Sequence, residues 1–70
     1  MSRRFHLLRL EDVSGLSGCG VVASGVVFED GRVALEWFGS RSSINIYNCI
    51  DDIEYLHGHQ GKTLIIYDDP

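Results

Sequence analysis

The sequence predicts a mainly β fold: a small five-stranded antiparallel sheet with one short helix before the last strand, shaped either as an SH3-like barrel or as a curved sheet. Three observations predict it. An Asp30-Gly31 pair separates two alternating apolar runs, which indicates a hairpin whose type I′ turn needs positive φ at both central residues. Other short runs alternate in the same way, and a single stretch has a helical period. Because a two-stranded ribbon is marginal in water, the flanking segments must add strands and a cover.

The five expected strands span residues 5–10, 19–28, 32–38, 44–47 and 62–67. In the first of them, Phe5, Leu7 and Arg9 share one face, but the other face also carries leucines. This imperfect alternation indicates a strand covered on both sides, by sheet curvature or by a second subunit. In the second strand, Ser24-Gly25 interrupts the apolar pattern and predicts a bulge or a sharp bend.

One helix of two to three turns is expected between the fourth and fifth strands. Asn48 is its expected N-cap, and Asp51 and Asp52 fall in the first turn, where negative charge suits the helix dipole. Gly58 should close the helix as its C′ residue, with His57 in the last turn. The residues at i, i+3 and i+6 form an apolar stripe that should cover the sheet: Ile50, Ile53 and Leu56.

Length and composition bound the class of protein. Residues 1–70 make one domain, and a core this small favours self-association, so the first expected partner is a second copy of the chain. The net charge of −4 argues against non-specific DNA binding. The chain has no apolar leader after its first residues and no run long enough to cross a membrane, so we expect a cytoplasmic protein. Cys19 and Cys49 are expected to be small buried hydrophobic residues.

No motif in the sequence indicates a catalytic site. The serines lie in loops without a nucleophile elbow, so we expect no enzyme and no cofactor. The sequence His57-Gly58-His59 is a candidate metal-binding motif, because histidine is a common metal ligand. The signal is weak, since no second pair of ligands follows at the spacing of a zinc site. We therefore predict no metal site, and interpret His57 as a helix C-terminal residue and His59 as a turn residue.

A resemblance covers nearly the whole chain. It rests on three groups of residues: Glu11-Asp12-Val13-Ser14-Gly15-x-Ser17-Gly18-x-Gly20, then Asp30-Gly31-x-Val33-x-Leu35-x-Trp37, and finally His57-Gly58-His59-x-Gly61-x-Thr63. With this pattern the chain resembles a group of small proteins of actinobacteria, archaea and their viruses. The resemblance implies a compact stand-alone domain and no reaction. Its viral side implies a host-directed binding role.

We therefore expect the protein to function by binding, and the sequence allows two classes of ligand. The first is a small phosphorylated or nucleotide-like molecule, such as a signal molecule that a phage protein sequesters. Loop amides, hydroxyls and cations suit phosphate oxygens, and the predicted site residues are Ser14, Gly15, Ser17, Gly18, Arg41, Ser42, Ser43 and Lys62. The second is a host protein, bound and blocked through a sheet edge or an acidic surface. The glycine-rich segment is also adequately explained as a plain connection between two strands.

Overall fold

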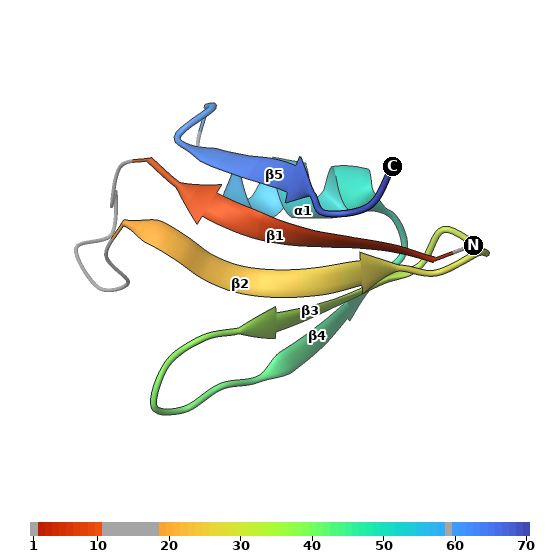
Figure 1. Ribbon diagram of the computed structural model, residues 1–70, viewed down its shortest axis with the longest axis horizontal. Coiled ribbons are helices and arrows are strands. Elements are labelled where there is room, and N and C mark those ends of the chain that lie inside the picture. The colour runs from red at the N-terminus through yellow and green to blue at the C-terminus, as the bar shows by residue number, and fades with distance from the viewer. Residues whose placement is uncertain (1, 11–18, 59) are drawn as a thin grey trace.

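The computed structural model describes residues 2–10, 19–58 and 60–70 (Figure 1). The elements follow the predicted order: β1 (Arg3–Arg9), β2 (Gly20–Val27), β3 (Val33–Trp37), β4 (Ile44–Tyr47), α1 (Ile50–His57) and β5 (Thr63–Tyr67). The fourth strand has the predicted bounds, and the other elements differ from theirs by one or two residues. The mainly β fold class, with one short helix before the last strand, is confirmed.

The five strands form one antiparallel sheet in the order β4-β3-β2-β1-β5. Because β4 and β5 occupy opposite edges, the described strands form an open curved sheet and not a closed barrel. Helix α1 carries the chain from one edge to the other, and β1 and β5 pass in front of it in Figure 1. The sheet therefore has one face covered by α1, the core face, and one face that no described helix or strand covers, the open face.

The central hairpin forms where predicted, with a different turn. The Gly31 amide donates to the Phe28 carbonyl at 2.9 Å, and the Phe28 amide donates to the Arg32 carbonyl at 2.8 Å. Gly31 has a φ of 90°, whereas Asp30 is not in the left-handed region, so the type I′ prediction is wrong. A turn with negative φ at its central residues, followed by a left-handed glycine, is the usual three-residue hairpin connection.

The irregularity of β2 also lies elsewhere than predicted. The pairing register of β1 and β2 shifts between Leu7 and Leu8, which places the bulge near Val22 and not at Ser24-Gly25. Gly25 instead allows a close approach. A Cβ atom there would lie 2.6 Å from Cζ of Phe5 and 2.5 Å from the Ala34 carbonyl oxygen. The Phe5 ring thus covers a position that only glycine leaves open.

The enclosed core lies between α1 and the core face. In the described part of the chain it contains seven buried hydrophobic residues: Phe5, Leu7, Val22, Ala23, Val33, Leu35 and Ile53. The helix contributes Ile53 fully and Ile50 partly, but Leu56 is 55% exposed, so the predicted stripe is only two residues long. Cys19 and Cys49 are both exposed free thiols, and their predicted burial is wrong. Both lie at the ends of elements, outside the packed layers.

The helix ends differ from the prediction by one position each. Cys49, not Asn48, occupies the N-cap, and its side chain makes no capping hydrogen bond. Gly58 keeps a right-handed helical φ of −67°, and the described residues Gln60 and Gly61 have left-handed φ values. The acidic first turn and His57 in the last turn are as predicted. Within the described residues, no helix has the length and apolarity needed to cross a membrane.

Candidate functional site

The predicted site residues that the structure describes lie at one end of the sheet, which we call the loop end: the end where β1 and β3 finish and β2, β4 and β5 begin (Figure 1). Arg41, Ser42 and Ser43 are exposed in the β3–β4 loop, and Lys62 immediately precedes β5. The remaining predicted residues lie outside the described residues: Ser14, Gly15, Ser17 and Gly18. Their segment joins β1 to β2 at this same end.

The structure does not bring Arg41 and Lys62 together. Their loops belong to opposite edges of the sheet, with β2 and β1 between β3 and β5. At a strand spacing of about 4.8 Å, β3 and β5 are about 14 Å apart. Each cation therefore belongs to its own side of the loop end.

The loop end contains an arginine that the predicted site did not include. Arg9 is the last residue of β1, its side chain lies on the core face with Phe5 and Leu7, and only 6% of it is exposed. Its register partner across the sheet is Thr63, which is also 6% exposed. The Nε atom of Arg9 and the Oγ1 atom of Thr63 are buried without a hydrogen-bond partner among the described residues. A buried charge or hydroxyl in this condition is costly unless something else pairs with it.

Backbone hydrogen bonds fix the surroundings of this pair. The Leu10 amide donates to the Lys62 carbonyl at 2.7 Å, and the Thr63 amide donates to the Gly58 carbonyl at 3.0 Å. The end of β1, the start of β5 and the end of α1 are thereby tied together. Arg9 and Thr63 are neighbours on the core face, and Lys62 precedes Thr63 in the chain. A guanidinium beside a hydroxyl is a pair of donors suited to phosphate oxygens.

A sequence signal for Arg9 exists. It lies in the phase of two inward apolar residues, at i, i+2 and i+4 from Phe5, and an arginine in the inward phase of a strand is unusual. What the pattern does not reveal is whether such an arginine finds a carboxylate inside the fold.

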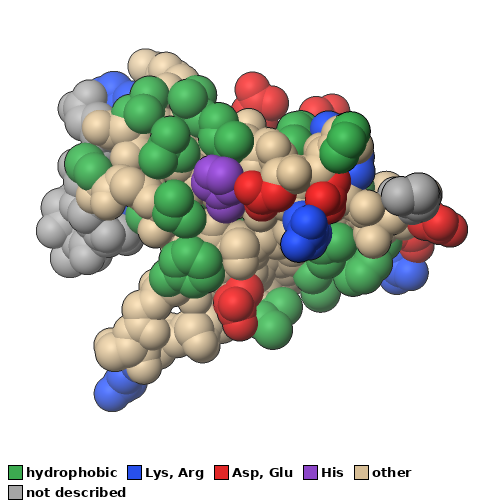
Figure 2. All heavy atoms as spheres, viewed as in Figure 1, with side chains coloured by type: hydrophobic (Ala, Val, Ile, Leu, Met, Phe, Trp, Pro, Cys, Tyr) green, Lys and Arg blue, Asp and Glu red, His purple; other side chains and the backbone are tan. Residues whose placement is uncertain are grey.

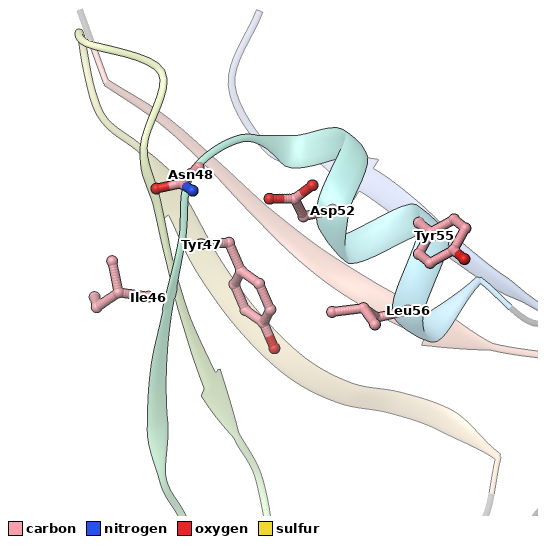
Figure 3. Close-up of a pocket in the computed structure, with 6 residues that line it drawn as sticks. All are labelled: Ile46, Tyr47, Asn48, Asp52, Tyr55 and Leu56. Carbon is pink, nitrogen blue, oxygen red and sulfur yellow. The ribbon is translucent and has the colours of Figure 1, made fainter.

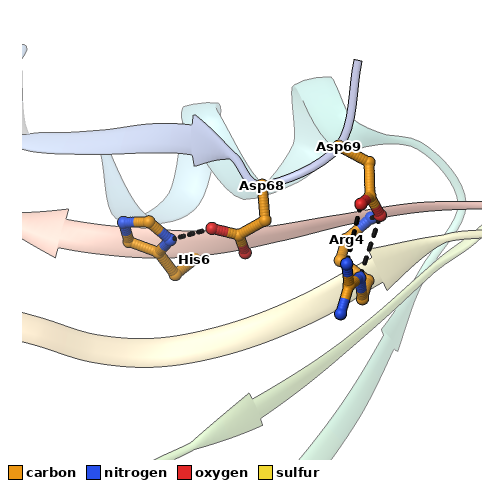
Figure 4. Close-up of polar contacts among 4 residues, drawn as sticks. All are labelled: Arg4, His6, Asp68 and Asp69. Atoms are coloured by element: carbon orange, nitrogen blue, oxygen red, sulfur yellow. Dashed lines mark hydrogen bonds and ion pairs between the residues drawn. The ribbon is translucent and has the colours of Figure 1, made fainter.

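Arg3 and Arg4 contact residues at the C-terminal end of the chain, although the Nε atom of Arg3, like that of Arg9, is buried without a hydrogen-bond partner among the described residues. Arg4 donates from its backbone amide and its Nε atom to Oδ2 of Asp69, both at 3.0 Å, and from Nη2 to Oδ1 at 2.8 Å (Figure 4). The hydrogen bonds from Arg4 lower the pKa of Asp69 to about 2. Nδ1 of His6 lies 2.8 Å from Oδ1 of Asp68, and the Arg3 guanidinium lies 3.7 Å from the centre of the Tyr67 ring. The C-terminal residues are thus bound to β1, away from the loop end.

Two surface hollows flank α1. A cleft of about 310 Å³ opens between β4 and α1, where Tyr47, Asp52 and Leu56 surround the space (Figure 3). A groove of about 600 Å³ runs between β5 and α1, with Asp51 and Glu54 on its helical side. Neither is lined by lysine or arginine. Both suit an apolar or cationic occupant better than a phosphate.

An aromatic cluster joins the helix end to the sheet. The Tyr47 hydroxyl lies 3.0 Å from Nε2 of His57, and the His57 ring packs edge-on against Trp37 with ring centres 4.9 Å apart. His57 is thereby placed as a packing residue at the end of α1, while His59 lies outside the described residues. Where the structure describes the chain, no three His, Cys, Asp or Glu side chains gather closely enough to hold a metal ion.

Comparison with known protein families identifies a match over nearly the whole chain. The model of a family described as Acb5 phage protein matches residues 2–69. No curated protein and no solved structure shows a significant match. The family match agrees with the viral association expected from the sequence, and its length covers nearly every residue discussed above.

Proposed function

Because the chain belongs to the Acb5 phage protein family, we propose that it works in the host cytoplasm as a non-enzymatic binding module that holds a small phosphorylated or nucleotide-like ligand. The observation that carries the proposal is Arg9, a buried cation whose Nε atom has no hydrogen-bond partner in the described part of the chain. It lies beside the Thr63 hydroxyl, which has none there either. A phosphate oxyanion supplies both the missing charge and the missing acceptors. Binding of this kind removes a signal molecule from solution without any chemical step.

The energetics favour a ligand as the counter-charge. A buried guanidinium nitrogen without a hydrogen-bond partner costs free energy, and that cost is offset when an anion accepts its hydrogen bond. The free energy released adds to the stability of the loaded protein. At a ligand concentration 100 times the Kd, binding stabilises the folded state by about 2.7 kcal/mol. For a domain of this size such a gain raises the Tm by about 10–20 °C.

The test measures the Tm of the purified protein with three probes: inorganic phosphate, AMP and adenosine. We expect phosphate and AMP to raise the Tm, and adenosine, which has no phosphate, to leave it unchanged. The variant Arg9→Met keeps an apolar stem of similar length and removes the charge. It should abolish the response while the ligand-free Tm stays equal or rises, because apolar replacement of a buried charge is often stabilising.

Matched variants separate this site from the one expected from the sequence. Lys62→Ala should weaken the response, whereas Arg41→Ala should change it little, because β2 and β1 separate the Arg41 loop from Arg9. The competing source of a counter-charge is a carboxylate of Glu11 or Asp12. If Glu11→Gln or Asp12→Asn lowers the ligand-free Tm and Arg9→Met lowers it equally, Arg9 is neutralised within the chain and the proposal fails.

A second candidate function is the binding and blocking of a host protein. The observation that favours it is the groove between α1 and β5. The unpaired edge of β5 can add an extended strand, and Asp51 and Glu54 lie above that edge. An extended segment with basic side chains fits this combination. Capture of a defined host protein by the wild type, lost in Glu54→Lys and kept in Arg9→Met, is the result that this function requires.

A further inference from the structure

The open face of the sheet carries exposed apolar side chains among its polar ones. Its residues alternate with those of the core face, and on β4 the alternation is inverted: Ile44 and Ile46 are each 65% exposed while Asn45 shares the side of the core. Figure 2 views the sheet from this side and shows hydrophobic side chains spread over it. All five strands contribute apolar residues, among which Val21, Ile44 and Ile46 are at least half exposed. Arg4, which pairs with Asp69, lies on the same face.

The outer strands contribute matching residues. Ile44 and Ile46 lie at the β4 edge, and Leu64 and Ile66 lie at the β5 edge, with β2 as the central strand between them. Apolar residues at both edges of the sheet allow each edge of one copy to pack on the opposite edge of a second copy. The enclosed core of this small domain is limited, so a second apolar layer adds burial that the single chain lacks.

One row of the sheet is self-complementary across all five strands. Pairing registers align Ile66 with His6, His6 with Ser24, Ser24 with Glu36, and Glu36 with Ile44. The row therefore reads apolar, basic, small, acidic, apolar. If a second copy of this row is rotated by a half turn about Ser24 and placed on the first, complementary side chains face each other. Ile66 then lies over Ile44, His6 over Glu36, and Ser24 over Ser24.

We propose that the open face is the interface with a second copy of this chain, related by a two-fold axis that runs along β2 between the two sheets. The two copies then form a sandwich in which β5 of each packs on β4 of the other. The small side chain of Ser24 lies at the axis and lets the sheets approach. Sheets that pack face to face in this way are about 10 Å apart, with nearly aligned strands.

The charged residues favour this axis over a two-fold axis that lies between the sheets but runs perpendicular to the strands. That second axis also brings the two open faces together, but it places Glu36 over Glu36 and His6 over His6. Like charges in contact are unfavourable. The axis along β2 pairs His6 with Glu36 on both sides. Asp68 engages only Nδ1 of His6, and Nε2 makes no hydrogen bond among the described residues. That nitrogen is the atom available to the carboxylate of the second copy.

The first test determines the oligomeric state of the protein in solution. Its molar mass is measured by sedimentation equilibrium over a range of concentrations. Wild-type protein should be a dimer that dissociates on dilution. Ile44→Lys should be monomeric at concentrations where the wild type is dimeric, because it places an ammonium group among the apolar residues at the β4 edge. Leu56→Lys is the matched control: Leu56 is similarly exposed but lies on α1, behind the sheet. It should leave the dimer intact.

The second test examines the position of the axis. In a background with Cys19→Ser and Cys49→Ser, which removes both exposed thiols, Ser24→Cys should be cross-linked to its own copy by a short bis-maleimide reagent. Sheets about 10 Å apart hold the two Cα atoms too far apart for a disulfide but within reach of such a linker. Ser40→Cys in the same background is exposed in the β3–β4 loop and should not be cross-linked. Far-UV circular dichroism of each variant verifies that it is folded.

Three outcomes overturn the proposal. A wild-type protein that stays monomeric at every concentration shows that the open face serves a different protein or no partner. A dimer that survives Ile44→Lys shows that the copies meet elsewhere, for example at the edges of β5. A dimer that Ile44→Lys dissociates but Ser24→Cys does not cross-link shows a different arrangement of the two faces.

Discussion

Replacing Gly25 by alanine tests the packing of the core most directly. Its φ lies outside the left-handed range, so alanine would normally stabilise the protein by about 0.4–1 kcal/mol through the unfolded state. Here the added Cβ would lie 2.5 Å from the Ala34 carbonyl oxygen and 2.6 Å from Cζ of Phe5. Overpacking of this kind costs about 1–3 kcal/mol. The clash should win, with a net loss of about 1–2 kcal/mol and a fall in Tm of about 5–15 °C.

Thermal and urea unfolding followed by circular dichroism measure this change. Gly31→Ala is the comparison: it has open space around its Cβ but a φ of 90°, so its cost of about 1–2 kcal/mol comes from backbone strain alone. The cost of Gly25→Ala should shrink by at least about 0.5 kcal/mol in a Phe5→Leu background, because the ring responsible for one contact is gone. A Gly25→Ala protein with a Tm above that of the wild type would refute the packing argument.

Two further predictions concern polar contacts. Asp69→Asn should flatten the acid dependence of stability: Arg4 holds the pKa of Asp69 at about 2, below its usual 3.8, so the stabilisation from this pair is complete above pH 4 and is lost as the pH falls through 2. Urea unfolding at pH 5 and at pH 2.5 should show a smaller difference for the variant than for the wild type. Tyr47→Phe should lower the free energy of unfolding by about 0.5–1.5 kcal/mol, because His57 loses the hydroxyl 3.0 Å from its Nε2 atom. Urea unfolding followed by Trp37 fluorescence measures it, and an unchanged midpoint would show that water replaces the bond.

Much of the fold could be predicted because its signals are local. Alternation over four or five residues located the strands, and Asp30-Gly31 located the hairpin. The sequence did not predict the turn type. A type I′ turn, with two left-handed residues, and the observed turn, with a left-handed Gly31 alone, can both contain an Asp-Gly pair. The bend in β2 was placed at Gly25 for a similar reason: glycine marks both bulges and close approaches, and only the position of the Phe5 ring distinguishes them.

The candidate site was predicted in part. The sequence indicated an anion-binding role for the loops at one end, but it grouped Arg41 with Lys62, which the strand order places at opposite edges. Arg9 was placed on the same strand face as Phe5 and Leu7, but it was predicted neither as buried nor as a site residue. Its importance depends on its burial and on the lack of a partner for Nε among the described residues, and both follow from which elements surround it.

The sequence by itself determined the order of strands and helix, the position of the central reversal and the acidic start of the helix, because each depends on residues a few positions apart. The tertiary structure alone decided that the sheet stays open, that apolar side chains are exposed on the face opposite α1, and that Arg9 lies beside Thr63. The physical reason is that these features arise when β1 pairs with β5, segments more than fifty residues apart. No local pattern encodes the free energy of that pairing.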